Sequence, residues 1–501
     1  MSNGDFMKPL YKILSVMICI FILISLTGCD SGSNAAIVYF ELDKKPDTLD
    51  AQLASSDQEL MIVRNIYEGL MRENSEGKIV NGACESYEKN GLVYTFKLRK
   101  DAAWSTGVPL TADDFVFAFR RAVDKKTDAP FAKRLFKIQN AQKIHKGQAA
   151  TDSLGVKALD DRTLEITLIA EDDDFEKTLT TSICMPCNED FFNQCHGQYG
   201  LKSSYIISNG SYSITKWNRE DFGIRIYRNS SYNGDFKAKN GAVFFSLEED
   251  TTPAERLISN KVDIAFINNE SVEKFNNEDF TQLSYENICW FLTIGNQYNG
   301  NLRKAFSMLT ASSVYSTKLS VGFRAADSMF PSSLSIEENL NSVGFSEYNT
   351  SDALSIFSQE VIKYEDKKFP SSTLTYYDNP AIKPAVTAIV GHWQQSVSAF
   401  INISAYKENS DLSPQLTSQT LPMAVFYIKA SSGYIDEYLE NFGFDYVGQN
   451  LANVQTELLR NRSIIPIAFE NTNIIYSRAL KNVYSSNSNG YVDFSFITKK
   501  D

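Results

Sequence analysis

The clearest pattern of hydrophobic and polar positions in this chain predicts a strand, a turn and a helix in succession. Bulky and polar residues alternate through 94–99, which is typical of a half-buried strand. The sequence WSTG at 104–107 interrupts the alternation with turn-forming residues. Thr111 can cap a following helix, whose first turn carries two carboxylates where the helix dipole favours negative charge. Three apolar residues then repeat at helical spacing, namely Phe115, Phe119 and Ala122.

Similar patterns recur along the rest of the chain. Alternating or apolar runs predict strands at 37–42, 163–168, 224–228 and 423–428. Other segments predict helices at 57–70, 124–150, 253–259 and 380–400. A length of 501 residues exceeds what one hydrophobic core organises, so we expect two or three domains. The apolar content of 43% is ordinary for a globular protein and calls for no special class.

The first residues have the pattern of an export signal. Two lysines precede an apolar run at 13–26, which is short for a membrane-spanning helix and fits the core of a signal peptide. The sequence LTGC that ends at Cys29 resembles a lipobox, whose cysteine is lipidated and becomes the new N-terminus after cleavage. We therefore expect a lipoprotein signal peptide at 1–28 and a polar tether at 29–34. The alternative is an ordinary secretory signal with an incidental cysteine.

Charge and motif content argue against two classes of function. The formal net charge is -12 and no basic stripe is present, which argues against nucleic acid as a partner. The three histidines are His145, His196 and His392, and none lies in a catalytic motif. No nucleophile elbow, zinc-protease helix or phosphate-binding loop occurs. We expect a protein that is not an enzyme. An exported hydrolase is the remote alternative, and product release from peptides or glycans would reveal it.

The cysteines leave several states open. They are Cys19, Cys29, Cys84, Cys184, Cys187, Cys195 and Cys289. The first lies in the predicted signal and the second is assigned to lipid, so five remain and not all can pair within one chain. The C-x-x-C at 184–187, followed by Cys195 and His196, has ligand types that suit zinc, but no second half of a zinc site is evident. A disulfide and free thiols are the alternatives, and we expect neither a metal nor a cofactor.

Residues 98–121 read LRKDAAWSTGVPLTADDFVFAFRR and resemble the signature of the family 5 extracellular solute-binding proteins. The form expected is L-R-x-x-x-x-W-S-x-G-x-P-(L/V)-T-A-x-D-F-V-x-(A/S)-(W/F)-(K/R)-R, and the match keeps its spacing throughout. Shorter segments also resemble the family, including TLD at 48–50, NGSY at 209–212 and RKAF at 303–306. Members of this family include oligopeptide-binding lipoproteins that feed ABC importers. Beyond residue 306 the likeness thins.

The resemblance implies an α/β fold. It is a two-lobed, periplasmic-binding-protein-like clamshell of type II with an accessory domain, joined by a hinge. The implied parts are lobe I at 35–66, 204–285 and 468–501, the accessory domain at 67–203, and lobe II at 286–467. The chain would pass between the lobes near Tyr285 and Phe469. Lobes joined by two such crossings can close about a ligand without repacking either core.

The resemblance also indicates positions where relatives contact cargo, each with a structural alternative. Ser55 and Ser56 lie on a loop where relatives present backbone groups to the ligand, or they cap the helix that follows. Asn268 and Asn269 lie where relatives offer side-chain amides, or they form a solvated turn. Trp290 is a ligand platform or a core residue. The signature itself is expected to build the accessory domain and not to touch cargo.

Relatives place the sequence W-x-A-D on the second lobe, where the aspartate pairs with the free amine of a peptide. The equivalent stretch here makes Phe426, Tyr427, Ile428 and Lys429 candidate ligand residues. Tyr427 takes the place of the tryptophan, the acid is missing, and Lys429 brings the opposite charge. The cargo is then a longer peptide gripped along its length, an N-blocked or acidic peptide, or another compound. We expect Lys429 to face the ligand.

The function implied by the resemblance is that of a substrate-binding lipoprotein of an ABC transporter. It would capture oligopeptides between its lobes and deliver them to a membrane permease. Strand-like segments can pair with the repeating donors and acceptors of a peptide backbone, whatever its side chains. We expect a monomer, anchored by lipid to the outer face of the cytoplasmic membrane. The alternatives are the same fold carrying a nickel chelate, haem or an oligosaccharide, or a peptide-signal sensor.

Overall fold

The computed structural model describes residues 36–248, 250–406, 423–430, 433–444, 450–461, 464–485 and 491–500. The predicted signal peptide, the tether and Cys29 lie outside these ranges. No helix within them is both long and apolar enough to cross a membrane.

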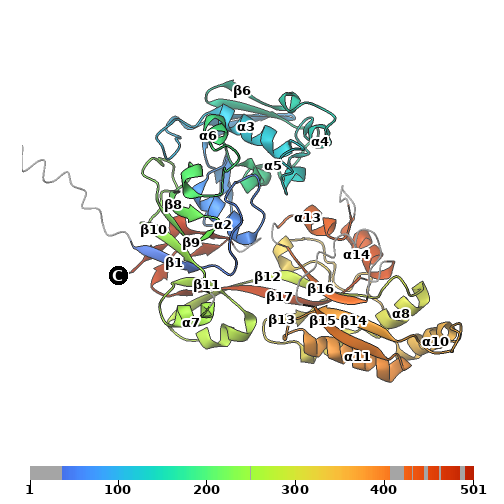
Figure 1. Ribbon diagram of the computed structural model, residues 1–501. Coiled ribbons are helices and arrows are strands. Elements are labelled where there is room, and N and C mark those ends of the chain that lie inside the picture. Colours follow the sequence, from blue (N-terminus) through green and yellow to red (C-terminus); the bar gives the residue numbers. More distant parts are fainter. Residues whose placement is uncertain are drawn as a thin grey trace, which may run out of the picture.

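A large mixed sheet runs through both halves of the molecule (Figure 1). Its strand order is β15-β14-β16-β12-β17-β11-β1-β10-β9-β8, and β13 pairs with β17 on the side. In that order the strands are β15 (Ile401–Tyr406), β14 (Ser372–Tyr377), β16 (Ala424–Lys429), β12 (Phe280–Thr293), β17 (Ile464–Ser477), β11 (Ile264–Ile267), β1 (Ile37–Glu41), β10 (Ala242–Ser246), β9 (Asp221–Arg228) and β8 (Tyr212–Asn218), with β13 at Phe323–Ala325. The sheet therefore has no division into two separate sheets at its centre.

The two longest strands, β12 and β17, connect the halves of the sheet. They are antiparallel neighbours along almost their whole length. One end of β17 pairs with β11, and the opposite end of the β12–β17 ribbon pairs with β16. We call the elements around β1 and β8–β11 the first lobe, and those around β13–β16 the second lobe. A register shift between Glu286 and Ile288 interrupts the ladder between the lobes, and such a bulge bends and twists a strand locally.

A third part, the accessory unit, packs beside the first lobe at the top of Figure 1. Its four-stranded sheet has the order β4-β5-β7-β6, with bounds Cys84–Asn90, Val93–Leu98, Thr163–Thr167 and Val156–Asp160. Its helices are α3 (Ala112–Val123), α4 (Ala141–His145), α5 (Phe175–Thr178) and α6 (Glu189–Gln194). Two-stranded ladders join β2 (Met71–Glu73) to β3 (Ile79–Asn81), β18 (Leu480–Lys481) to β21 (Thr498–Lys499), and β19 (Tyr484–Ser485) to β20 (Val492–Asp493).

The strand and helix predicted around residue 100 are present as β5 and α3. Thr111 is the N-cap residue, and Asp114 accepts from the Thr111 backbone N–H at 2.9 Å in a capping box. The fully buried Trp104 donates its indole N–H to the same carboxylate at 3.1 Å. The signature thus fixes the start of α3 to the preceding turn, which is the structural role expected for it.

The helix predicted over 124–150 is wrong. Helix α3 ends at Val123, and only the short α4 lies within that range apart from a 3-10 turn. Asp128 and Asn140 have positive φ values of 49° and 66°. A left-handed residue cannot continue a right-handed helix, so each of them breaks the segment. The basic and polar composition of the segment gave no sign of these breaks.

The remaining helices cover the faces of the large sheet. They are α2 (Asp57–Ile66) and α7 (Pro253–Ile258) in the first lobe, and α8 (Gly300–Met308), α9 (Ser312–Tyr315), α10 (Thr350–Val361), α11 (Lys383–Val397), α13 (Ile435–Glu440) and α14 (Leu451–Arg460) in the second. The predicted helix at 380–400 corresponds to α11. One continuous core contains both the accessory unit and most of the first lobe, whereas two other cores lie within the second lobe. The second lobe can therefore move relative to the rest without disturbing a shared core. The domain boundaries derived from the sequence remain predictions.

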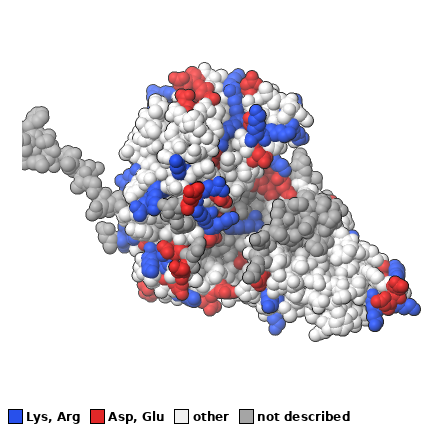
Figure 2. Space-filling view, viewed as in Figure 1, with Lys and Arg blue, Asp and Glu red and all other residues white. Residues whose placement is uncertain are grey.

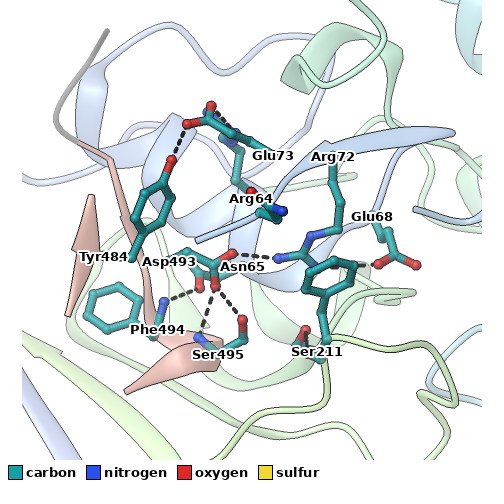
Figure 3. A network of polar contacts seen from close by, with 12 residues as sticks. Arg64, Asn65, Glu68, Arg72, Glu73, Ser211, Tyr484, Asp493, Phe494 and Ser495 are labelled. Carbon is teal, nitrogen blue, oxygen red and sulfur yellow. Dashed lines mark hydrogen bonds and ion pairs between the residues drawn. The ribbon is translucent and has the colours of Figure 1, made fainter. Parts of the chain in front are cut away.

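The C-terminal segment is tied to the first lobe by a polar network (Figure 3). Arg72 forms ion pairs with both Glu68 and Asp493, and the hydroxyl of Tyr484 donates to Glu73. The side chain of Asn65 on α2 bonds the backbone on both sides of Asp493. These contacts explain how a segment more than 400 residues from α2 completes the same core.

Candidate functional site

A cavity of about 450 Å³ lies between the lobes, where β12 and β17 cross. The first lobe contributes Asp43, Asp57, Asn268 and Asn269 to its lining, and the other side contributes Trp290, Tyr377, Tyr427, Lys429 and Glu470. We call it the central cavity. A wider groove of about 640 Å³ lies on the accessory unit alone, around Phe117 and Phe192. Movement of the lobes cannot enclose that groove, so the central cavity is the candidate binding site.

Three adjacent strands form the wall of the central cavity on the second-lobe side. Across β16, β12 and β17, Trp290 is the neighbour of Tyr427, and Ile288 is the neighbour of both Lys429 and Glu470. Because side chains alternate along a strand, these residues share the face that borders the cavity. The local sequence therefore places an aromatic pair next to a cation and an anion on adjacent rungs of one sheet.

The same alternation places Phe426 and Ile428 on the opposite face. They are 2% and 7% exposed and belong to the core that also contains Phe291 and Phe442. The ring of Phe426 stacks on Phe291 at a centroid distance of 5.7 Å. Of the four consecutive residues predicted to contact ligand, the structure brings only Tyr427 and Lys429 to the central cavity.

Lys429 forms an ion pair with Asp57 at the start of α2, which joins the second lobe to the first. Asp43, on the loop after β1, lines the same part of the cavity. Asp43 is exposed to solvent, but desolvation by the surrounding cleft raises the pKa of its carboxyl, and the charge of Asp57 raises it further, against the opposing effect of Lys429. Sequence reasoning identified Lys429 but missed both aspartates.

Glu470 on β17 is the third cavity residue that sequence reasoning missed. Its Oε2 accepts from the indole N–H of Trp290 at 2.7 Å, and its Oε1 accepts from the side-chain amide of Asn269 at 3.2 Å. Burial raises the pKa of the Glu470 carboxyl, although these two hydrogen bonds and the charge of Lys429 oppose the shift. Its only signal in the sequence is that it is the first charged residue after the apolar run at 464–469.

The predicted asparagines lie on the first-lobe side of the cavity, directly after β11. Asn268 caps a 3-10 helix by accepting from the backbone N–H of Ser271 at 3.1 Å. Asn269 is buried and accepts from the side-chain amide of Asn473 at 2.7 Å while donating to Glu470. Asn269 therefore positions Glu470, and Asn268 combines a capping role with a place at the cavity.

The predicted serines cap α2 and do not line the central cavity. Ser56 is the N-cap residue, and the backbone N–H groups of Ser55 and Ser56 both donate to Glu59 Oε2 at 2.9 Å. Burial opposes ionisation of Glu59, but four backbone N–H donors outweigh burial and lower the pKa of its carboxyl. The cap fixes the start of α2 and thereby positions Asp57, the next residue, at the edge of the cavity.

A second set of contacts closes the space between the accessory unit and the second lobe. Arg134 forms a two-point ion pair with Glu437 on α13, in which one N–O distance is 2.8 Å. The ring centroid of Tyr434 lies 4.8 Å from Cζ of Arg134 and 4.7 Å from Nζ of Lys177 on α5. Figure 1 shows α5 and α13 facing each other at the mouth between the two halves.

Cysteine and metal chemistry give no further site within the described ranges. The five cysteines there are unpaired and buried. Burial raises the pKa of the Cys184 and Cys187 thiols to about 12, so neither is a ready nucleophile or metal ligand at neutral pH. No cluster of three or more metal-ligating side chains was found in the described part of the chain.

The surface shows where charge gathers. On the face drawn in Figure 2, basic and acidic side chains alternate over the first lobe and accessory unit, and the second lobe is largely uncharged except at its far end. This arrangement offers no single-sign patch comparable to a nucleic-acid interface on that face.

Two lobes joined by crossing strands, with a cavity lined from both, define a two-lobed solute-binding protein. The profile described as "Bacterial extracellular solute-binding proteins, family 5 Middle" matches residues 78–450, and the chain belongs to this family. The family assignment made from the signature is therefore confirmed. The protein is a binding protein and not an enzyme.

Relatives with curated names support the same class. The dipeptide-binding protein DppE of Bacillus subtilis is 23% identical over 473 residues, which cover 87% of this chain and 84% of DppE. The periplasmic murein peptide-binding protein MppA of Escherichia coli is 33% identical over 229 residues, covering 44% of this chain and 41% of MppA. The match to MppA, like that to several other peptide-binding relatives, thus spans less than half of the relative's length.

Solved structures share the fold over nearly the whole chain. The Listeria monocytogenes OppA bound to peptide has a TM-score of 0.74 at 19% identity, covering 94% of this chain and 100% of that one. The pheromone receptor PrgZ has a TM-score of 0.73 at 20% identity, covering 93% and 99%. The predicted α/β, two-lobed fold of type II is confirmed.

Proposed function

We propose that the protein captures oligopeptides in the central cavity and delivers them to the permease of an ABC importer. The observation that carries the proposal is the cavity itself, which is lined from both lobes and crossed by the two strands that join them. Its volume lies within the range of about 300–1,000 Å³ that is usual for ligand sites. Closure around a cargo would exclude bulk water from the contacts made there.

The lining suits a peptide backbone. The amide side chains of Gln58, Asn379 and Asn471 border the cavity and supply both donors and acceptors. The half-buried ring of Tyr427 adds aromatic contact that accepts different side chains, whereas Trp290 is only 1% exposed and supports that ring from the core of the second lobe. Several related proteins are named as oligopeptide-, dipeptide- or murein-peptide-binding, which favours a peptide over a nickel chelate, haem or an oligosaccharide.

Export and anchoring complete the proposal. The family is extracellular, in agreement with the predicted export signal. The LTGC sequence supports lipidation at Cys29 and attachment to the outer face of the cytoplasmic membrane. We propose that the anchored protein acts as a monomer. Labelling with a radioactive or clickable fatty acid would test this, because Cys29→Ser should abolish incorporation and release the protein from the membrane.

The function is tested by identifying the cargo. Mass spectrometry of the ligand released from protein purified from its natural host should detect peptides. Calorimetry with a mixed peptide library should give micromolar or tighter binding, and small-angle scattering should show compaction on addition of the same library. Neither heat nor compaction with any peptide would overturn the peptide assignment and favour a non-peptide cargo.

Sensing is the second candidate function. The likeness to the pheromone receptor PrgZ covers almost the whole chain, so a signalling peptide fits the same fold. Uptake of a radiolabelled copurified peptide by whole cells distinguishes the two. Transport predicts accumulation that depends on this protein, whereas sensing at the surface does not.

A further inference from the structure

The charges that line the central cavity do not balance. Three carboxylates, on Asp43, Asp57 and Glu470, border it, whereas Lys429 is the only lysine or arginine of the described lining. Lys429 is already paired with Asp57. Asp43 and Glu470 are therefore left without a cation within ion-pair distance in the described part of the chain. A cavity that holds unpaired carboxylates in a partly desolvated place favours a positively charged occupant.

The surroundings of Glu470 hold its carboxylate in one orientation. Both of its hydrogen-bond donors, the indole of Trp290 and the amide of Asn269, are neutral groups on different elements. Asn269 is itself fixed by Asn473 and by the backbone oxygen of Asn471. A carboxylate accepts about four hydrogen bonds. The two donors therefore orient the Glu470 carboxylate, and its oxygens can still accept further hydrogen bonds from a ligand. Because both donors are neutral, neither compensates the negative charge of Glu470.

Three aromatic rings lie beside this carboxylate. The rings of Trp290, Tyr377 and Tyr427 lie with centroids 5.1, 5.3 and 6.3 Å apart and are inclined to one another by 48° to 77°. All three border the central cavity, but Trp290 is only 1% exposed, so Tyr377 and Tyr427 present the accessible faces and Trp290 supports them from behind. We call them the aromatic wall. The faces of such rings attract cations, most strongly when the cation has lost water.

We propose that Glu470 and the aromatic wall bind a protonated amine of the cargo, which makes Glu470 a specificity-determining residue of the cavity. The inference rests on the proposed capture of peptides and names the chemical class of their anchoring group. The amine is either the N-terminal ammonium of a peptide or the ammonium of a lysine side chain. Both have the same charge and donors, and the experiment below distinguishes them.

This assignment changes the expectation drawn from the sequence alone. The stretch that contains Lys429 lacks an acid, and on that basis an N-blocked or acidic peptide was among the expected cargoes. The structure supplies an acid from a different strand, two strands away from Lys429, on the same face of the sheet. The positive charge of Lys429 is balanced by Asp57 in their ion pair. The carboxylates of Asp43 and Glu470 therefore give the lining of the cavity a net negative charge.

The test compares the protein with Glu470→Gln, which keeps an oxygen acceptor for Trp290 but removes the charge. Four libraries of five-residue peptides serve as probes in calorimetry: free or acetylated N-termini, each with lysine or with norleucine. The wild-type protein should lose about tenfold to a hundredfold in affinity when the anchoring amine is removed, as expected for a hydrogen bond to a charged group. Loss on acetylation identifies the N-terminal amine, and loss on replacing lysine identifies the side chain.

In Glu470→Gln, the same amine should give less than about a threefold advantage, and the amine-free library should bind as it does to the wild type. Tyr427→Leu should show an intermediate loss for the amine libraries. Glu338→Gln, at an exposed position of the second lobe, is the matched control and should behave as the wild type. Urea unfolding of each variant checks that a change in binding is not a failure to fold.

The outcomes separate the two proposals. Wild-type protein that binds all four libraries equally, or an unchanged amine preference in Glu470→Gln, overturns the amine site while peptide binding stands. Wild-type protein that binds none of them overturns peptide binding. In that case, mass spectrometry of the copurified cargo decides the amine site: a cargo with a basic nitrogen that Glu470→Gln fails to retain supports it, and a cargo without one overturns it.

Discussion

Lys429 of the second lobe and Asp57 of the first form an ion pair across the central cavity. The two residues are 372 positions apart in the sequence and belong to different lobes. The pair therefore exists only when the lobes face each other. Their side chains are 28% and 21% exposed, which places the pair between a screened surface contact and a buried one. Such a pair contributes roughly 1 kcal/mol or less. It therefore biases the position of the lobes without locking them.

Replacing Lys429 with methionine should shift the preference of the cavity toward cationic cargo. The change leaves three carboxylates and no described cation in the lining, because Lys429 supplies the only positive charge there. Affinity for lysine-containing peptides should rise relative to glutamate-containing peptides by about three- to tenfold, equivalent to roughly 1 kcal/mol. Calorimetry at two salt concentrations measures this ratio, which should shrink at high salt.

Lys304→Met, at an exposed position on α8, is the control and should leave the ratio unchanged. If Lys429→Met and Lys304→Met gave the same ratio, the placement of Lys429 at the cargo would be wrong.

The contact between Arg134 and Glu437 should stabilise the closed arrangement of the accessory unit and second lobe. The Arg134 side chain is only 6% exposed, and a two-point contact to a carboxylate is geometrically specific. Glu437→Gln should cost the closed state about 1.5 to 3 kcal/mol, since it removes the charge from a hydrogen-bonded pair. Apparent affinity for cargo should fall by about tenfold or more, and the radius of gyration without added cargo should increase in small-angle scattering.

A neighbouring ion pair provides the control for the contact between Arg134 and Glu437. Lys133 and Glu440 connect the same two elements, but the lysine side chain is 60% exposed and the contact is solvated. Lys133→Met should therefore leave both affinity and radius nearly unchanged. Equal effects of Lys133→Met and Glu437→Gln would show that general charge, and not the Arg134 contact, controls closure.

The local part of the fold could be predicted from the sequence because its determinants are adjacent. Thr111 and Asp114 form a capping box across four residues, so the local pattern alone indicates where α3 begins. The breaks at Asp128 and Asn140 carry no such signal, since asparagine and aspartate adopt positive φ only in particular surroundings. The polar composition of residues 124–150 therefore led to the prediction of a helix that the backbone does not form.

The site was less predictable, for two different reasons. Period-two alternation alone separates Tyr427 and Lys429 from Phe426 and Ile428, so that distinction was available from the predicted strand. Glu470 was not available, because its role depends on β12 being the neighbour of both β16 and β17. A local sequence pattern does not indicate which strands become neighbours. For the same reason, the sequence did not identify Asp57 as the partner of Lys429.

Arg121 should be essential for stability, although it lies far from the central cavity. It joins the last turn of α3 to the first lobe by pairing with both carboxylate oxygens of Asp50, and it also bonds Gln52 at 2.7 Å. The Asp50 side chain is 1% exposed. Arg121→Met leaves a buried carboxylate unpaired, which typically costs about 3 to 5 kcal/mol. The urea midpoint should fall markedly, while Arg219→Met, in a solvated pair with Asp47, should leave it in place.

The buried cysteines predict thiol chemistry that depends on folding. The thiols of Cys84, Cys184, Cys187, Cys195 and Cys289 are all free and buried. Burial also raises the pKa of the Cys84 thiol to about 12, so the reactive thiolate is scarce. In the mature lipoprotein, which lacks Cys19 and carries lipid on Cys29, Ellman's reagent should react slowly with the native protein and with five thiols after unfolding in urea. Recovery of three or fewer thiols under non-reducing conditions would reveal a disulfide and contradict the arrangement described.

Binding of amine-containing peptides should weaken as the pH falls, with Glu470 as a principal cause. Burial raises the pKa of its carboxyl above the ordinary value of about 4.3. The amine stays protonated across the acidic range, and only the ionised carboxylate pairs with it. Affinity should therefore be constant between the raised carboxyl pKa and the pH at which the amine begins to lose its proton, which is about 7 for an N-terminal amine. It should decline as the pH falls through the carboxyl pKa, with uptake of a proton on release of the peptide.

Other groups that face Glu470 determine how this profile is read. Lys429 and Asp57 also line the cavity, Tyr427 titrates far above the range because burial raises its pKa, and the pKa of Asp43 is also raised. Calorimetry between about pH 4 and pH 8 on Glu470→Gln and Asp43→Asn separates the two carboxyls. Glu470→Gln should flatten most of the decline and Asp43→Asn only part of it. A decline that Glu470→Gln leaves intact would assign the titrating group to Asp43 instead.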